Sequence, residues 1–203
     1  MGTILWIQPA AALLLGYCLG SVPFGLILTR LGGAGDLRAV GSGNIGATNV
    51  LRTGRKGLAA LTLLLDMAKG TAAVLIGAAI DPGLAPLAAV GALVGHLYPV
   101  WLRFAGGKGV ATLFGIALAF SILTNDPLYA AVFAVAWLGM IALTRISSLG
   151  GMTAAALLPV TAAVLGRFDL VVLYLGLSLL VLWKHRANLE RLLAGTEPKV
   201  GKS

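Results

Sequence analysis

Charged residues are scarce in this sequence: Asp, Glu, Lys and Arg together make up only 11% of its 203 residues. Soluble domains normally contain about 25% charged residues, so a soluble globular protein is excluded. Hydrophobic residues instead make up 59% of the chain, and the mean hydropathy is +0.96. Since one membrane-spanning helix needs roughly 20 mostly apolar residues, the composition predicts an all-α, polytopic integral membrane protein.

Cysteine and histidine are also scarce. With one cysteine and two histidines, the chain can form no internal disulfide and offers no ligand cluster for zinc, so we expect neither a metal nor another cofactor. The single cysteine, Cys18, is interpreted as a small packed apolar residue. No Lys or Arg precedes the apolar N-terminal run, which disfavours a cleavable signal peptide.

Apolar runs predict seven transmembrane helices within a single integral membrane domain over residues 1–203. The runs are Thr3–Leu28, Leu58–Ile80, Leu84–Leu102, Val110–Asn125, Pro127–Thr144, Gly150–Gly166 and Leu170–Trp183. Inside the second run, Asp66 and Lys69 are three residues apart and are interpreted as an ion pair that holds helices together. The glycine pairs Gly16/Gly20 and Gly91/Gly95 have the GxxxG spacing, which lets helix backbones approach closely.

Basic residues predict the orientation of these helices. Thirteen of the 15 Lys and Arg residues fall in alternate connections and in the C-terminal tail, namely Arg30, Arg38, Arg52, Arg55, Lys56, Arg103, Lys108, Arg145, Lys184, Arg186, Arg191, Lys199 and Lys202. The opposite connections contain only Arg167. The positive-inside rule therefore predicts an outer N-terminus and a cytoplasmic C-terminus. Because topology accounts for the net charge of +8, we expect no nucleic-acid partner.

The first cytoplasmic connection, residues 36–52, contains Gly41, Gly43 and Gly46 in the spacing GxGxxG. A dinucleotide site is excluded, because that motif needs a βαβ unit and the flanking segments here are apolar helices. Glycine-rich backbone nevertheless forms concave anion sites from successive N–H groups. The same segment supplies further donors for a phosphate, namely Ser42, Asn44, Thr48, Asn49 and Arg52. The alternative is a flexible, solvated loop.

The second cytoplasmic connection combines a histidine with a glycine-rich turn, namely His96 and then Gly106, Gly107, Lys108 and Gly109. A Walker A nucleotide site is excluded, since that motif requires glycine at the position of Leu102 and Ser or Thr at the position of Gly109. The glycines, the lysine and a helix that begins near Val110 still predict an anion site. For His96, a structural role and a functional role both stay open.

The last two cytoplasmic segments contain further polar residues. Arg145 and Ser148, in the third connection, are either substrate contacts or a basic anchor with a helix cap. In the tail, His185 and Asn188 are three residues apart and therefore share one helix face. The leucines and charges that follow suggest an amphipathic helix at the membrane surface, and simple binding of anionic lipid is the alternative.

Four motifs follow one another over almost the whole chain. They are GSGNIGATN at residues 41–49 with Arg52, Leu65-Asp66 with Lys69-Gly70, Gly95-His96-x-x-Pro99 with GGKGVAT at residues 106–112, and His185-Arg186-x-Asn188 with Arg191-Leu192-Leu193. Together they resemble the bacterial membrane acyl-phosphate:glycerol-3-phosphate acyltransferases. The resemblance implies seven helices, a bacterial inner-membrane location and an active site facing the cytoplasm. It also implies the reaction: acyl phosphate and glycerol 3-phosphate give 1-acyl-glycerol 3-phosphate and phosphate, the first step of phospholipid synthesis.

The resemblance further implies which residues act. Ser42, Arg52, His185 and Asn188 are expected to be catalytic, and the loop cation Lys108 is a fifth candidate. The remaining loop residues are expected to contact substrate or its phosphate, namely Gly41, Gly43, Asn44, Thr48, Asn49, His96, Gly106, Gly107, Gly109, Arg145 and Ser148. Besides both substrates and the lipid bilayer, no obligate protein partner is expected.

The residues themselves agree with an acyl-phosphate donor. The His-x4-Asp box of coenzyme-A-using glycerol-phosphate acyltransferases is missing, since Trp101 stands five residues after His96 and Glu190 five after His185. An acyl phosphate already has a good leaving group, so the protein chiefly needs to position it and stabilise charge. We favour proton transfer to the substrate's phosphate over a histidine base. A transporter is the rival function, disfavoured because clear repeated halves are missing.

Overall fold

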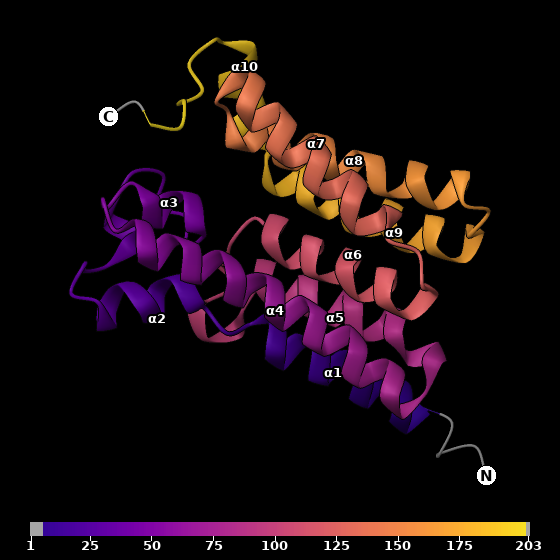
Figure 1. Cartoon of the computed structure of the whole chain (residues 1–203). Helices are drawn as coiled ribbons and strands as arrows, with labels where there is room; N and C mark the ends of the chain where they lie inside the picture. The colour runs from indigo at the N-terminus through magenta and orange to yellow at the C-terminus, as the bar shows by residue number, and fades with distance from the viewer. Residues whose placement is uncertain (1–5, 202–203) are drawn as a thin grey trace. The chain divides into compact units, whose positions relative to one another are not determined.

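The computed structural model describes residues 6–201, and within this range the chain is helical and contains no β-strand (Figure 1). Thr3 to Leu5, where the first predicted span begins, and Lys202 of the basic tail lie outside the described residues. The chain divides into two compact units, Met1–Ala119 (unit 1) and Phe120–Ser203 (unit 2). The organisation as a single domain stays a prediction.

Unit 1 is built on three helices that pack side by side, α1, α4 and α5 (Figure 1). Its helices are α1 (Ile7–Gly20), α2 (Phe24–Leu31), α3 (Ala47–Leu51), α4 (Lys56–Ile80), α5 (Ala85–Leu97) and the start of α6 (Val110–Thr124). The predicted glycine packing is confirmed. A Cβ on Gly16 would collide with the carbonyl oxygen of Ala88, and one on Gly91 with that of Leu13. Only glycine allows α1 and α5 to approach this closely.

The first apolar run is one candidate span, Ile7–Leu31, but its helix is interrupted between Gly20 and Phe24. Pro23 is the cause, because proline has no N–H and disfavours helical geometry in the residue before it. The released carbonyl groups are bonded by side chains: Trp101 Nε1 donates to Ser21 O at 2.8 Å, and Lys69 Nζ donates to Val22 O at 2.8 Å. Satisfying these groups inside the protein is what makes a broken helix tolerable at membrane depth.

Unit 2 consists of the end of α6 and four further helices. They are α7 (Leu128–Thr144), α8 (Ser147–Val164), α9 (Phe168–Lys184) and α10 (Arg186–Leu193). The helix α8 packs against both α7 and α9, around fully buried rings such as Phe133 and Tyr174. The chain bends by 61° between α9 and α10. The residue at the bend is His185, which lies between the two helices.

Each of the seven predicted intervals contains a helix, and the prediction of a multi-pass, all-α membrane protein is confirmed. Within residues 6–201, four helices are long and apolar enough to span a membrane, or up to five if α9 and α10 are counted as one bent span. The helices α6 and α7 are apolar but shorter. The count of seven spans and their orientation stay predictions.

Two details differ from the sequence interpretation. The third predicted run agrees with the candidate span Pro82–Leu102, but its α-helix, α5, ends at Leu97, because Pro99 moves the preceding Tyr98 out of helical geometry, with φ −140° and ψ 57°. Cys18 is exposed, so its interpretation as a packed residue is wrong. It lies on the outward face of α1, where a small apolar thiol suits a lipid-facing position.

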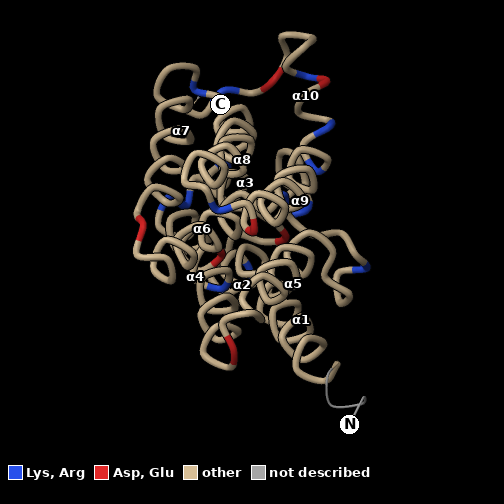
Figure 2. The backbone as a smooth tube through the Cα atoms, turned by 90° about the vertical axis from the view of Figure 1, so that its right-hand side faces the viewer, with Lys and Arg blue, Asp and Glu red and all other residues tan. Residues whose placement is uncertain are grey.

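Charged residues lie at the ends of α7, α8 and α9 rather than along them (Figure 2). The helix α4 is different, because Asp66 and Lys69 both lie inside it and are buried. Their ion pair is confirmed, with Lys69 Nζ 2.6 Å from Asp66 Oδ1.

Candidate active site

The first glycine loop, residues 40–52, is organised around the buried side chain of Asn49. Its Nδ2 donates to the carbonyl oxygens of three residues, Leu37 at 3.0 Å, Val40 at 2.9 Å and Asn44 at 2.8 Å. Its Oδ1 accepts from Ser42 N at 3.3 Å and from Arg52 Nη1 at 3.4 Å. Asn49, predicted to contact phosphate, thus uses its amide within the loop and fixes the loop's shape.

The loop presents a cation beside glycine backbone. Gly41 and Gly43 have φ angles of +51° and +68°, a left-handed conformation that glycine adopts without steric cost. A Cβ on Gly41 would lie 2.8 Å from Arg52 Cδ and 2.9 Å from its Nη1, so the Gly41 backbone lies against the Arg52 side chain. Arg52, Ser42 and Thr48 are exposed. These residues form the surface that a phosphate would meet.

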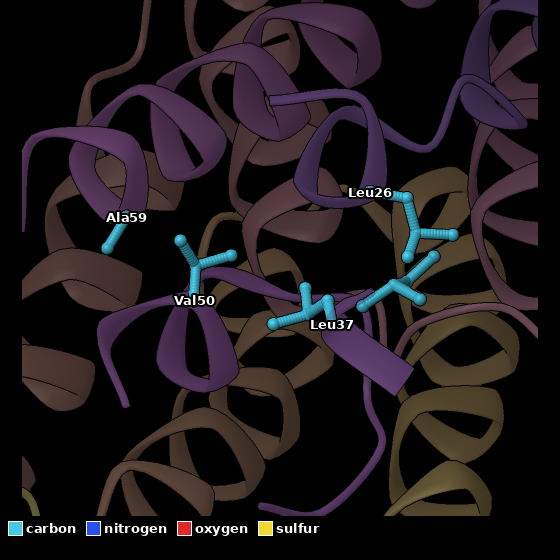
Figure 3. Close-up of a cluster of buried hydrophobic side chains, with 5 residues drawn as sticks. Leu26, Leu37, Val50 and Ala59 are labelled. Carbon is cyan, nitrogen blue, oxygen red and sulfur yellow. The ribbon is translucent and has the colours of Figure 1, made fainter. Parts of the chain in front are cut away.

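Apolar side chains attach this loop to unit 1. They come from α2, the short 3₁₀ helix Leu37–Ala39, the loop, α3 and α4, and they form one buried cluster, Leu26, Leu37, Ile45, Val50 and Ala59 (Figure 3). Just before the loop, Asp36 accepts hydrogen bonds from the backbone N–H and the guanidinium of Arg38. The Arg38 guanidinium holds the pKa of the Asp36 carboxyl well below its usual range. The loop is therefore ordered at its base and polar at its surface.

The second glycine loop is built on His96, a buried residue near the end of α5. The carbonyl oxygen of His96 accepts a hydrogen bond from Gly107 N at 3.0 Å. A Cβ on Gly107 would collide with the His96 imidazole, and one on Gly106 with the His96 carbonyl oxygen. Both glycines are therefore needed for the loop to pass this close to His96. Lys108 follows directly, and Gly109, with φ +84°, leads into α6.

Unit 2 contains a polar cluster that sequence reasoning missed, centred on the carboxylate of Glu197, whose side chain is 6% exposed. Ser148 Oγ donates to Glu197 at 2.6 Å, Asn188 Nδ2 at 2.5 Å and Arg191 Nε at 2.7 Å. Burial alone would raise the pKa of the Glu197 carboxyl, but these three hydrogen bonds outweigh it and the pKa is lowered. The predicted residues Ser148 and Asn188 are thus brought together by an acidic residue of the tail.

The other predicted residues of unit 2 lie around this cluster. His185 is buried, and its Nδ1 is 2.8 Å from the carbonyl oxygen of Val181, a contact that favours a proton on Nδ1. The His185 carbonyl accepts from Asn188 N at 2.8 Å, so the backbones of the two residues are joined by one tight helical turn. Arg145 is exposed, and its carbonyl oxygen accepts from Val200 N at 2.7 Å. Among the described residues, no three His, Cys, Asp or Glu side chains form a group that would hold a metal ion.

Comparison with known proteins decides the family. A sequence model of the family described as glycerol-3-phosphate acyltransferase matches residues 10–195. The chain belongs to the glycerol-3-phosphate acyltransferase family. It is 57% identical over 192 residues to the glycerol-3-phosphate acyltransferase of Mesorhizobium japonicum. The aligned residues cover 94% of this chain and 95% of that protein. It is 53% identical over 196 residues to that of Methylorubrum populi, with 97% and 95% covered.

Solved structures agree with this assignment. The crystal structure of PlsY (YgiH), an integral membrane glycerol 3-phosphate acyltransferase in its glycerol 3-phosphate form, matches with a TM-score of 0.86 and 35% identity over 95% of this chain and 96% of that one. Its lysophosphatidic acid form matches with a TM-score of 0.83 and 32% identity, covering 95% of each chain. The predictions of a membrane-embedded acyltransferase of phospholipid synthesis, acting on glycerol 3-phosphate to give lysophosphatidic acid, are confirmed.

Proposed function

We propose that the enzyme uses acyl phosphate as its acyl donor. The observation that supports this donor is that each glycine loop of unit 1 contains a cation: the Arg52 side chain lies against Gly41, and Lys108 directly follows Gly106 and Gly107 in the chain. Two phosphorylated substrates require two such anion sites. The ligands named for the PlsY structures, glycerol 3-phosphate and lysophosphatidic acid, support the same acceptor and product here.

The site belongs, in this proposal, to an enzyme with seven spans whose glycine loops face the cytoplasm of a bacterial cell. The concentration of Lys and Arg in alternate connections supports that orientation. Helices in all seven predicted intervals support the count. Ser42, Arg52 and Lys108 bind the reacting phosphates, and His185 and Asn188 act in the same reaction.

In the proposed reaction, the sn-1 hydroxyl oxygen of glycerol 3-phosphate attacks the acyl carbon of acyl phosphate. A new ester C–O bond forms, and the bond between the acyl carbon and the bridging oxygen breaks. The phosphate leaves with that electron pair and takes the hydroxyl proton, so no protein base is required. Arg52 and Lys108 stabilise the negative charge of the phosphate groups during this transfer.

The donor is tested by supplying the purified protein with acyl phosphate, acyl-coenzyme A or acyl carrier protein, each with glycerol 3-phosphate and EDTA. We expect lysophosphatidic acid from acyl phosphate alone, because the chain has a phosphate-binding loop for the donor and no His-x4-Asp box for a thioester reaction. The acid is measured by mass spectrometry. Turnover that occurs only with a thioester would show that the donor is misassigned.

Proton transfer to the phosphate is tested at His185. A general base normally contributes about 10²–10⁴-fold to kcat. If the departing phosphate takes the proton, His185→Gln changes mainly KM for glycerol 3-phosphate and leaves kcat within about tenfold of the wild type. The measurement is kcat and KM between pH 5 and 9. A 10²-fold or larger fall in kcat with unchanged KM, together with loss of the acidic limb of the pH profile, would identify His185 as the base.

A further inference from the structure

The ion pair of Asp66 and Lys69 is unusual in its position. Both side chains lie in the middle of α4, and each is 4% exposed. A buried pair gains little stability over apolar residues of the same size, because desolvation offsets the attraction of the charges. A pair in this position therefore has another role than stability, and its contacts indicate which.

Lys69 contacts the segment that supports the first glycine loop. Its Nζ donates to Val22 O, in the interruption between α1 and α2, and lies 5.7 Å from the centre of the Phe24 ring at the start of α2. The next residue, Gly25, touches the loop directly, because a Cβ there would collide with the carbonyl oxygen of Ile45. Lys69 thus fixes the start of the helix on which the first loop rests.

Asp66 lies near His96, the residue that supports the second glycine loop. Its Oδ1 is 3.8 Å from Nδ1 of His96. The His96 imidazole in turn lies against Gly107, and the His96 carbonyl bonds Gly107 N at 3.0 Å. Asp66 therefore faces the ring that determines where the backbone of Gly106 and Gly107 can lie.

We propose that Asp66 and Lys69 are positioning residues that set both glycine loops, Asp66 through His96 and Lys69 through the interruption at Val22. This inference rests on the proposed function, since the two loops are taken as its two phosphate sites. Neither residue touches substrate in this proposal. One buried pair at the centre of unit 1 holds both loops in the geometry that binds phosphate.

The test compares two double variants. Each replaces both charged residues, so neither leaves a buried charge without its partner. Asp66→Leu/Lys69→Met and Asp66→Asn/Lys69→Met are both uncharged at this site and similar in volume, so both are expected to fold. Only the second retains an oxygen facing His96. We expect kcat to fall in both, because Lys69 no longer bonds Val22 O. We expect KM for glycerol 3-phosphate to rise about tenfold in the Leu variant, the effect of losing one buried polar contact, and to stay within about threefold of wild type in the Asn variant.

Coupling to His96 is measured with a third variant that keeps the ion pair. In the wild-type background, His96→Leu is expected to raise KM for glycerol 3-phosphate. In the Asp66→Leu/Lys69→Met background, the same change is expected to raise KM by less than about twofold, because the effects of residues that act through one contact are not additive. Thr71→Val is the matched control. It removes a partly buried hydrogen bond from α4 to Gly115 O at 2.9 Å and leaves Asp66, Lys69 and His96 in place, so KM should not change.

The melting temperature of every variant is recorded in detergent beside its kinetics. The proposal is overturned if Asp66→Leu/Lys69→Met keeps the wild-type KM, or if the His96→Leu effect multiplies fully with that of Asp66→Leu/Lys69→Met. If Asp66→Leu/Lys69→Met does not fold, kcat of Asp66→Asn/Lys69→Met still decides the question, because an unchanged kcat would show that the Lys69 bond to Val22 O does not set the first loop. Wild-type protein that makes no lysophosphatidic acid from acyl phosphate would instead refute the proposed donor, which separates the two failures.

Discussion

Arg52→Ala is expected to lower kcat by about 10²–10³-fold, the usual cost of removing one donor that stabilises charge in a transition state. Arg52 is the cation of the first glycine loop, and its guanidinium lies beside the Gly41 backbone and 3.4 Å from Asn49 Oδ1. Arg52→Lys should recover part of the activity, because it restores the charge without the planar fork. The measurement is kcat and KM for both substrates.

Arg55→Ala is the matched control for Arg52. Arg55 is exposed at the start of α4 and is predicted to lie on the same side of the membrane, so its loss removes one nearby positive charge without touching the glycine backbone. We expect its kcat to stay within about threefold of wild type, since an exposed charge acts weakly at a distance. Equal effects of Arg52→Ala and Arg55→Ala would mean that general surface charge, rather than a specific site, accounts for the loss.

Glu197→Gln is expected to destabilise unit 2 by about 1–3 kcal/mol, the cost of leaving buried donors imperfectly paired. The carboxylate accepts from Ser148, Asn188 and Arg191, and an amide would direct N–H groups at some of these donors. Ser148 and Asn188 would also lose their fixed orientation, so activity should fall together with stability. The measurement is the melting temperature in detergent and kcat at neutral pH.

The stabilisation by Glu197 should depend on pH with a definite sign. The folded state lowers the carboxyl pKa from its ordinary value of 4.5, so the contribution is complete above pH 4.5 and is lost as the pH falls below it. The difference in melting temperature between wild type and Glu197→Gln should therefore shrink towards zero in acid. Glu190→Gln, at an exposed position of α10, should show no such difference. A Glu197→Gln difference that does not shrink as the pH is lowered further and further below 4.5 would contradict this account.

The helices were predictable because their apolar runs are long and rarely interrupted. High hydropathy indicates that a segment is apolar enough for a lipid environment, and it therefore predicted all seven helical intervals. Hydropathy does not predict local backbone geometry. The interruption before Phe24 and the end of α5 at Leu97 both depend on single prolines, Pro23 and Pro99. Their effect on a helix depends on whether other residues satisfy the freed carbonyls, as Trp101 and Lys69 do here.

The site was predictable in its residue types but only partly in its arrangement. Glycines and donors in one segment indicated an anion loop. Residue type alone does not indicate that Asn49 is buried inside this loop while Arg52 is exposed. Glu197 was missed because a lone acid in a basic tail is ordinarily a solvated residue. A signal was present in Gly195, which has φ +68° and, just after the end of α10 at Leu193, allows the chain to turn back towards Asn188.

The central claim is tested most directly by measuring lysophosphatidic acid and inorganic phosphate in parallel. The purified protein receives acyl phosphate and glycerol 3-phosphate in EDTA, and both products are followed over time. The proposed reaction predicts that the two products form at equal rates and that no phosphate is released when glycerol 3-phosphate is left out. Phosphate release without lysophosphatidic acid, or lysophosphatidic acid that forms only after a thioester is added, would contradict it.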